Sequence, residues 1–114
     1  GGGFGISDGE YLPIVKVQPQ YPRRALSRGL AGYVIVEFTV TEQGTVRDPI
    51  VVENCGYIPN PRAPKECVDS PNSVFNSSAI KAASKFKYKP KVIDGVPIEA
   101  AGVQNKITFE LADS

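Results

Sequence analysis

Apolar and polar side chains alternate over residues 33–41. The even-numbered positions are all apolar, whereas the odd-numbered positions mix aromatic, aliphatic, charged and hydroxyl side chains. Because successive side chains of a strand point to opposite faces, this alternation predicts a strand with one buried face. The side chains that we expect in the core are Val34, Val36, Phe38 and Val40.

A second strand-like segment, residues 46–52, follows the short loop Glu42-Gln43-Gly44. A loop of this length, with a glycine available for positive φ, predicts a hairpin. Pro49 interrupts the second strand, and a proline cannot donate a hydrogen bond to a strand ladder. We therefore expect an edge position or a bulge at Pro49.

Alternation returns near the end of the chain, over residues 103–111, and predicts a further strand with one buried face. Just before it, Asp94-Gly95 is a turn signal that predicts a small irregular hairpin. The residues expected on the buried face of the last strand are Val103, Asn105, Ile107, Phe109 and Leu111.

Two helices are predicted. Pro22 suits the first position of a helix and Gly29 a helix stop, so we expect a helix over residues 22–28 with Ala25 and Leu26 facing the core. Asn72 or Ser73 can cap a second helix that ends before Pro90. The residues that recur there at helical spacing are Phe75, Ala79, Ala82, Ala83 and Phe86.

The order helix, hairpin, helix and strand predicts an α+β fold, with a small antiparallel sheet of three to four strands and two helices packed on one face. A chain of 114 residues suffices for one hydrophobic core. We expect one domain over residues 11–114, beginning with an extended segment over residues 11–18. Residues 1–10 are rich in glycine and are expected to be a flexible linker or an expression remnant.

Composition narrows the function. The chain contains no histidine, which excludes His-based triads, imidazole metal sites and ordinary proton shuttling near neutral pH. Its formal net charge is only +1, and no basic cluster has the flanking aromatic residues that stack nucleic-acid bases. These features exclude most enzyme classes, and we expect no cofactor, metal ion or nucleic-acid partner and a solvated surface for most Lys and Arg side chains.

Two cysteines, Cys55 and Cys67, lie in a segment over residues 54–72 that lacks periodicity and is rich in proline. We interpret this segment as a long loop closed by a disulfide bond, which indicates an oxidising, extracytoplasmic compartment. A disulfide across a loop of this size constrains the unfolded chain by about 3 kcal/mol. A pair of reduced structural thiols is a weaker alternative, and the spacing argues against a redox-active Cys-x-x-Cys pair.

These segments resemble the TonB C-terminal family in both order and spacing. The resemblance covers nearly everything after Tyr11, but this chain carries the long cysteine-bearing loop and has Phe86 where many members have Trp. The matching strings are Gln18-Pro19-Gln20-Tyr21-Pro22, Val34-Ile35-Val36-Glu37-Phe38-Thr39-Val40, Gly44-Thr45-Val46, Phe86-Lys87-Tyr88-Lys89-Pro90 and Ile107-Thr108-Phe109-Glu110-Leu111.

The resemblance implies an energy-transducing adaptor of the Gram-negative periplasm, with no catalytic activity. Such a domain binds the TonB box, a short segment of outer-membrane TonB-dependent receptors, by β-strand addition. An inner-membrane helix and a Pro-rich linker in the full-length protein would act with the ExbB and ExbD proteins. Proton-motive force would then drive uptake of a nutrient such as an iron siderophore.

Two segments carry the partner-binding residues that the resemblance implies, and we expect the last strand, over residues 104–110, to offer an open edge. The alternatives are an ordinary helix start for the first segment, and for the second an edge hidden by the preceding extended segment or by a second copy in a homodimer. A TolA-like scaffold domain is the alternative function. The expected partner-binding residues are Gln18, Pro19, Gln20, Tyr21, Gln104, Lys106, Ile107, Thr108, Phe109 and Glu110.

Overall fold

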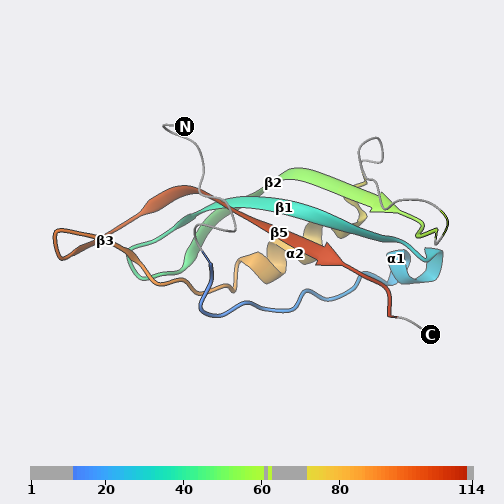
Figure 1. Cartoon of the computed structure of the whole chain (residues 1–114), viewed down its shortest axis with the longest axis horizontal. Coiled ribbons are helices and arrows are strands. Elements are labelled where there is room, and N and C mark those ends of the chain that lie inside the picture. The colour runs from blue at the N-terminus through green and yellow to red at the C-terminus, as the bar shows by residue number, and fades with distance from the viewer. Residues whose placement is uncertain (1–11, 61, 63–71, 113–114) are drawn as a thin grey trace.

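The structure is a computed structural model that describes residues 12–60, 62 and 72–112. The expected linker over residues 1–10 and most of the expected cysteine loop, including Cys67, lie outside the described residues. Figure 1 shows the order of the elements along the chain. They are α1 (Arg23–Arg28), β1 (Ala31–Val40), β2 (Val46–Tyr57), the 3-10 helix η1 (Ser73–Phe75), α2 (Asn76–Ala83), β3 (Lys91–Ile93), β4 (Val96–Ile98) and β5 (Ala100–Phe109).

The main sheet has the strand order β2-β1-β5 and is antiparallel throughout. β1 is the central strand, and the alternation predicted for it is confirmed, because Val34, Val36 and Val40 are fully buried and Phe38 nearly so. The strand begins at Ala31, two residues before the predicted start. Tight packing explains the small residue at position 32: a Cβ atom added to Gly32 would lie 1.9 Å from the carbonyl oxygen of Cys55.

Pro49 lies on the edge strand β2 and within an irregular part of the ladder, so both expectations for it are confirmed. The register with β1 shifts twice, and Asp48 adopts a φ of 54°. β2 continues to Tyr57, so the predicted loop start at Asn54 is wrong. Side chains in the second half of β2 lack the apolar alternation that marks a strand, and its pairing with β1 supplies the order instead.

The helix α1 begins at Arg23, one residue after the predicted start, because Pro22 is its extended N-cap. The helix ends at Gly29, whose φ of 66° gives the left-handed C-cap that glycine favours. Ala25 is fully buried, as expected, but Leu26 is 52% exposed, so its predicted core position is wrong. Successive residues of a helix point about 100° apart. A six-residue helix that turns Ala25 toward the sheet therefore leaves Leu26 toward solvent.

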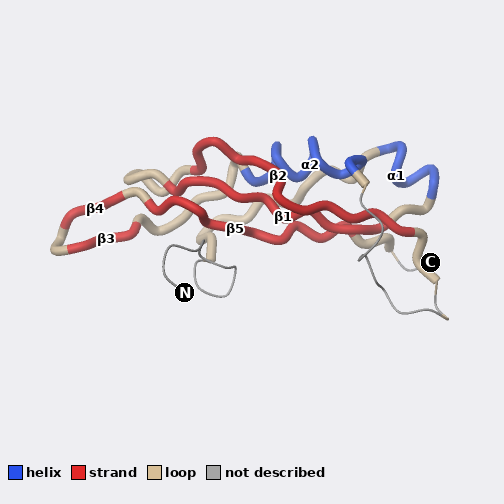
Figure 2. Tube along the Cα trace, turned by 90° about the horizontal axis from the view of Figure 1, so that it is seen from above, coloured by secondary structure: helices blue, strands red, loops and turns tan. Residues whose placement is uncertain are grey.

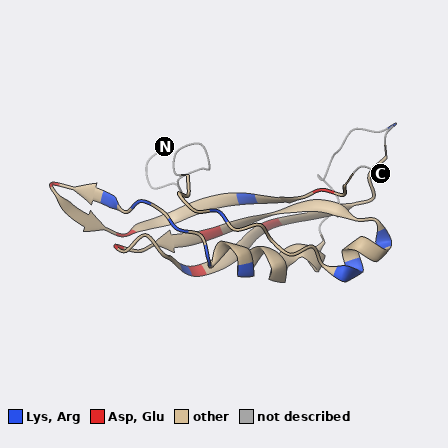
Figure 3. Ribbon diagram, turned by 90° about the horizontal axis from the view of Figure 1, so that it is seen from below, with Lys and Arg blue, Asp and Glu red and all other residues tan. Residues whose placement is uncertain are grey.

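The second helical segment begins where Asn72 caps it: the Asn72 side chain accepts a hydrogen bond from the Val74 backbone N–H at 3.0 Å. The first turn is the 3-10 helix η1, and α2 then runs to Ala83. Phe86 lies beyond the end of α2, although it is fully buried as predicted. Figure 2 shows both helices on the same side of the sheet, and Figure 3 shows Lys and Arg on that helical side.

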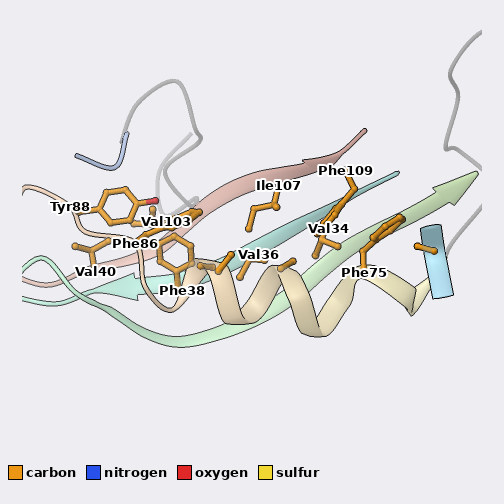
Figure 4. Packing of buried hydrophobic residues seen from close by; sticks show 14 of the residues in the cluster. Val34, Val36, Phe38, Val40, Phe75, Phe86, Tyr88, Val103, Ile107 and Phe109 are labelled. Carbon is orange, nitrogen blue, oxygen red and sulfur yellow. The ribbon is translucent and has the colours of Figure 1, made fainter. Parts of the chain in front are cut away.

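The core fills the space between the helices and the sheet (Figure 4). Phe75 and Phe109 stack with ring centroids 4.4 Å apart, and Phe38 packs against Tyr88 at 5.7 Å. Aromatic contacts of this kind add to the stabilisation that burial alone provides. Apolar side chains from β1, β5, η1 and α2 thus form one continuous core.

The predicted turn at Asp94-Gly95 is confirmed and joins β3 to β4 in a separate two-stranded sheet. Both turn residues have positive φ, 51° and 77°, which suits the twist of a two-residue hairpin. This hairpin extends from one end of a molecule measuring 52 × 28 × 21 Å (Figure 1). The predicted α+β fold is confirmed, with three strands in the main sheet and a separate hairpin formed by β3 and β4.

Candidate functional site

β5 is an edge strand, as expected for the last strand of the chain. Within the described residues its ladder partner is β1 alone. The register is regular from Val103 to Phe109, and the one shift lies near its start, opposite Phe38 and Val40. In an antiparallel pair, every second residue directs its N–H and C=O away from the partner strand. β5 therefore presents a regular row of backbone donors and acceptors on its outer side.

The opposite edge, formed by β2, is a poorer template for another strand. Pro49 lacks a backbone N–H, and Asp48 has a positive φ. The two register shifts against β1 bend this edge further. Proline and bulges are devices that protect sheet edges from additional pairing. Of the two edges, β5 is the one suited to strand addition.

The side chains expected to bind a partner from the last strand divide between two faces. Ile107 and Phe109 are only 2% exposed, so their side chains belong to the core and only their backbone is available to a partner. Thr108 is exposed. Glu110 is exposed as well, but it follows the end of β5 at Phe109. The strand therefore ends two residues before the predicted end at Leu111, and it begins at Ala100, three residues before the predicted start.

Gln104 and Lys106 interact across the outer face of the sheet, away from the helices. The Gln104 side-chain amide donates to the Glu37 carboxylate at 3.0 Å, and the Lys106 ammonium lies 4.3 Å from the centroid of the Tyr33 ring. The Tyr33 hydroxyl donates in turn to the Glu53 carboxylate. This hydrogen bond is the main cause that raises the pKa of Tyr33, and burial adds to it. These contacts join the three strands of the sheet.

The extended segment over residues 12–22, here called the lead-in, does not pair with β5 in the described structure. Ile14 donates to the carbonyl of Lys87 at 2.7 Å, and Lys87 donates to the carbonyl of Val15 at 2.9 Å. Lys87 also forms a bridge with Thr45, next to the β1–β2 turn. The backbone hydrogen bonds of the lead-in thus go to the segment after α2, which argues against the alternative that the lead-in hides the β5 edge.

Tyr21 connects the lead-in to β5. Its ring packs edge-on against Phe75 and Phe109, with centroids 5.7 Å away in each case. Its hydroxyl donates to the Leu30 carbonyl oxygen. The pKa of Tyr21 is raised, mainly by its partial burial and to a smaller extent by the charge of Tyr57. The structure therefore brings together one residue from each expected partner-binding segment, while Gln18 and Gln20 remain exposed.

A groove of about 370 Å³ lies between the lead-in and α2. Gln18, Pro19 and Gln20, all expected partner-binding residues, line one side with Val17. The residues on the α2 side were not among the expected partner-binding residues, because the lysines there were expected to be solvated. The spacing of Ser78 and Ala82 places them on one face of α2, but only the tertiary fold shows that this face meets the lead-in. The residues from α2 and its C-terminal turn are Ser77, Ser78, Lys81, Ala82 and Lys85.

Cys55 is fully buried at the end of β2 and is disulfide-bonded. Cys67, the partner that we expect, lies outside the described residues, so the pairing itself stays a prediction. None of the helices in the described part of the chain is long and apolar enough to cross a membrane.

Comparison with known proteins points to one family. A family model described as "Gram-negative bacterial TonB protein C-terminal" matches residues 17–58. Protein TonB of Vibrio cholerae is 29% identical over 106 residues, which cover 93% of this chain and 37% of that protein. The chain therefore spans little more than a third of this relative's length.

Two solved structures have similar folds over most of the chain. The solution NMR structure of the Pseudomonas aeruginosa TonB C-terminal domain has a TM-score of 0.64 and 25% identity, with 96% of each chain covered. The TonB2 protein from Vibrio anguillarum gives a TM-score of 0.57 and 30% identity, over 99% of this chain and 88% of that chain.

Proposed function

Because this chain belongs to the TonB C-terminal domain family, we propose that it is the receptor-binding end of a periplasmic energy transducer. Its partner is the TonB box of a TonB-dependent outer-membrane receptor. The box adds to β5 as a further antiparallel or parallel strand. The observation that carries this proposal is the regular outer edge of β5, from Val103 to Phe109. The opposite edge of the sheet, formed by β2, is interrupted by Pro49 and by two register shifts.

Strand addition accounts for both binding strength and selectivity. The outward backbone groups of β5 supply hydrogen bonds that do not depend on the peptide's sequence. Side chains of the added strand alternate between the two faces of the sheet, so one set lies near the exposed Thr108 and the other near the lead-in. Ordering a flexible peptide offsets much of the hydrogen-bond energy, and we expect a dissociation constant on the order of micromolar.

The transducing role requires parts of the protein beyond this domain. We infer that an inner-membrane anchor of the full-length protein works with ExbB and ExbD, and that proton-motive force pulls on the bound receptor through this domain. The resulting uptake concerns a nutrient such as an iron siderophore. The domain has no catalytic function in this scheme, since its output is mechanical.

A titration of the isotopically labelled domain with a TonB-box peptide tests the proposal. Backbone amide shifts should concentrate on residues 18–21 and 103–110 and should follow one binding isotherm. A scrambled peptide of the same composition is the control. Folded spectra with no shifts along β5 at millimolar peptide, or shifts confined to β2, would overturn the proposal and favour a scaffold role.

A further inference from the structure

The two segments that form the helical side of the molecule carry only positive charge. Residues 12–30 contain four Lys or Arg, residues 72–90 contain four Lys, and neither segment contains Asp or Glu. The net charge of the whole chain is nevertheless only +1, and the acidic residues that the structure describes lie largely along the sheet and its turns (Figure 3). A surface with one sign of charge attracts partners of the opposite sign.

The groove between the lead-in and α2 lies within this basic side. One wall consists of Ser78 and Lys81, which lie three positions apart on one face of α2, and of Lys85 in the turn that follows the helix. Ala82 is nearly buried at the base of that wall. The opposite wall offers the exposed side-chain amides of Gln18 and Gln20, which both donate and accept hydrogen bonds.

Lys81 and Lys85 are both exposed, and both line the groove, one from α2 and the other from the turn that follows it. The ion pairs within the described residues belong to Arg47, which contacts Asp48 and Glu99, and neither groove lysine takes part. A carboxylate bound between the two ammonium groups would remove their repulsion and add a charge-assisted hydrogen bond.

We propose that this groove binds an acidic segment next to the stretch of receptor peptide that pairs with β5. The proposal rests on the proposed function, since the peptide is held first at the β5 edge. Tyr21, which packs on Phe109, connects the two places, because it directly follows the groove residues Gln18 to Gln20. Carboxylates of the segment contact Lys81 and Lys85, while its backbone contacts the glutamine amides and serine hydroxyls.

A peptide fits this site better than an anionic membrane surface does. The basic side is hollowed between two walls, and an extended chain can enter a groove of about 370 Å³, near the lower end of ligand-site volumes. A bilayer instead meets a broad flat or convex face that carries apolar anchors as well as cations. Serine hydroxyls and glutamine amides also match the donors and acceptors of a peptide backbone.

The test uses three versions of one box peptide, with a five-residue acidic flank, an amide flank of Asn and Gln, or no flank. Each flank is placed at either end in turn. Affinities are measured by calorimetry or amide shifts at low and high salt for the wild-type domain, for K81Q/K85Q and for R28Q/K91Q. The last variant removes the same charge from exposed positions outside the groove.

The expected result is that the acidic flank tightens wild-type binding about fivefold over the amide flank at low salt, as two exposed charge pairs allow. K81Q/K85Q should lose this gain, R28Q/K91Q should keep it, and new shifts should appear at Ser78 and Lys85. Equal losses in both variants would overturn the proposal, because they would show general attraction. Groove shifts with anionic vesicles but none with the acidic flank would also overturn it.

The unflanked peptide separates this inference from the function on which it rests. Its binding at β5 without any effect of the acidic flank would refute the groove site alone. A failure of all three peptides to bind β5 would refute strand addition, and the groove proposal with it.

Discussion

Tyr21 and Phe109 lie edge-to-face with ring centroids 5.7 Å apart, although 88 positions separate them in the sequence. The contact fixes the lead-in against the last strand and closes one end of the core, where Phe75 stacks on Phe109. Because the Tyr21 hydroxyl also donates to Leu30, the lead-in is held just before β1 begins. One partly buried side chain thus positions both candidate partner-binding segments.

Replacing Tyr21 should destabilise the domain in two distinguishable steps. Y21F keeps the ring contacts and removes the hydrogen bond to the Leu30 carbonyl, which should cost about 1 kcal/mol of unfolding free energy. Y21A also removes the contacts with Phe75 and Phe109, and we expect a loss of about 3 kcal/mol, the low end for aromatic truncation because Tyr21 is only partly buried. Urea denaturation measures both.

Y33F is the matched control for the hydroxyl, because Tyr33 donates to Glu53 on the exposed outer face. Loss of that bond should change the unfolding free energy by less than about 0.5 kcal/mol. Equal effects of Y21F and Y33F would contradict the anchoring role of Tyr21.

Alkaline pH should weaken the domain partly through Tyr21. Burial raises the folded-state pKa of Tyr21 above 10.0, so the fold favours the neutral phenol. The stability from this preference is fully present below pH 10 and is lost as the pH rises through the folded pKa. Unfolding free energies measured between pH 8 and 11 should fall less steeply for Y21F than for the wild type. Parallel curves would show that Tyr21 contributes nothing to the alkaline loss.

The fold was predictable from sequence wherever local pattern and tertiary environment agree. β1 is buried on one face by alternating valines, and Gly29 and Asp94-Gly95 fit the backbone angles that their positions require. The predictions that Leu26 lies in the core and that a loop begins at Asn54 were wrong, because at these positions the tertiary environment overrides the local pattern. The orientation of the short helix α1 depends on what it packs against, and the second half of β2 is ordered by pairing rather than by its own side chains.

The candidate site was predictable as two segments but not as one arrangement. The resemblance placed residues in the lead-in and in β5, whereas the contact that joins them, between Tyr21 and Phe109, depends on tertiary packing. The α2 wall of the groove was missed because helical spacing identifies a face without indicating what lies opposite. Ile107 and Phe109 were included for their place in the strand, but their side chains belong to the core.

Gly44 should tolerate no side chain. Its φ is 81°, and an added Cβ would lie 2.0 Å from the Tyr88 carbonyl oxygen, where the Gly44 carbonyl already accepts a hydrogen bond from the Tyr88 N–H. G44A therefore combines backbone strain with a clash, and we expect a loss of about 3 kcal/mol. Urea denaturation monitored by circular dichroism gives the value.

G95A separates the clash from the strain. Gly95 has a similar φ of 77°, but nothing lies within 4 Å of its added Cβ. Only the left-handed strain remains, which costs about 1 kcal/mol. Similar losses for the two variants would mean that the contact between Gly44 and Tyr88 is not tight in solution.

Hydrogen exchange along β5 should alternate in the free domain. Amides that bond to β1 are protected, while every second amide points outward and exchanges faster, since β5 has one ladder partner in the described structure. A TonB-box peptide should slow the fast set and leave the outward amides of β2 unchanged, as strand addition at β5 requires. Uniformly slow exchange before any peptide is added would mean that the outer edge is already covered, by another part of the chain or by a second copy. In that case a dilution series would distinguish the two, because only a second copy gives protection that depends on concentration.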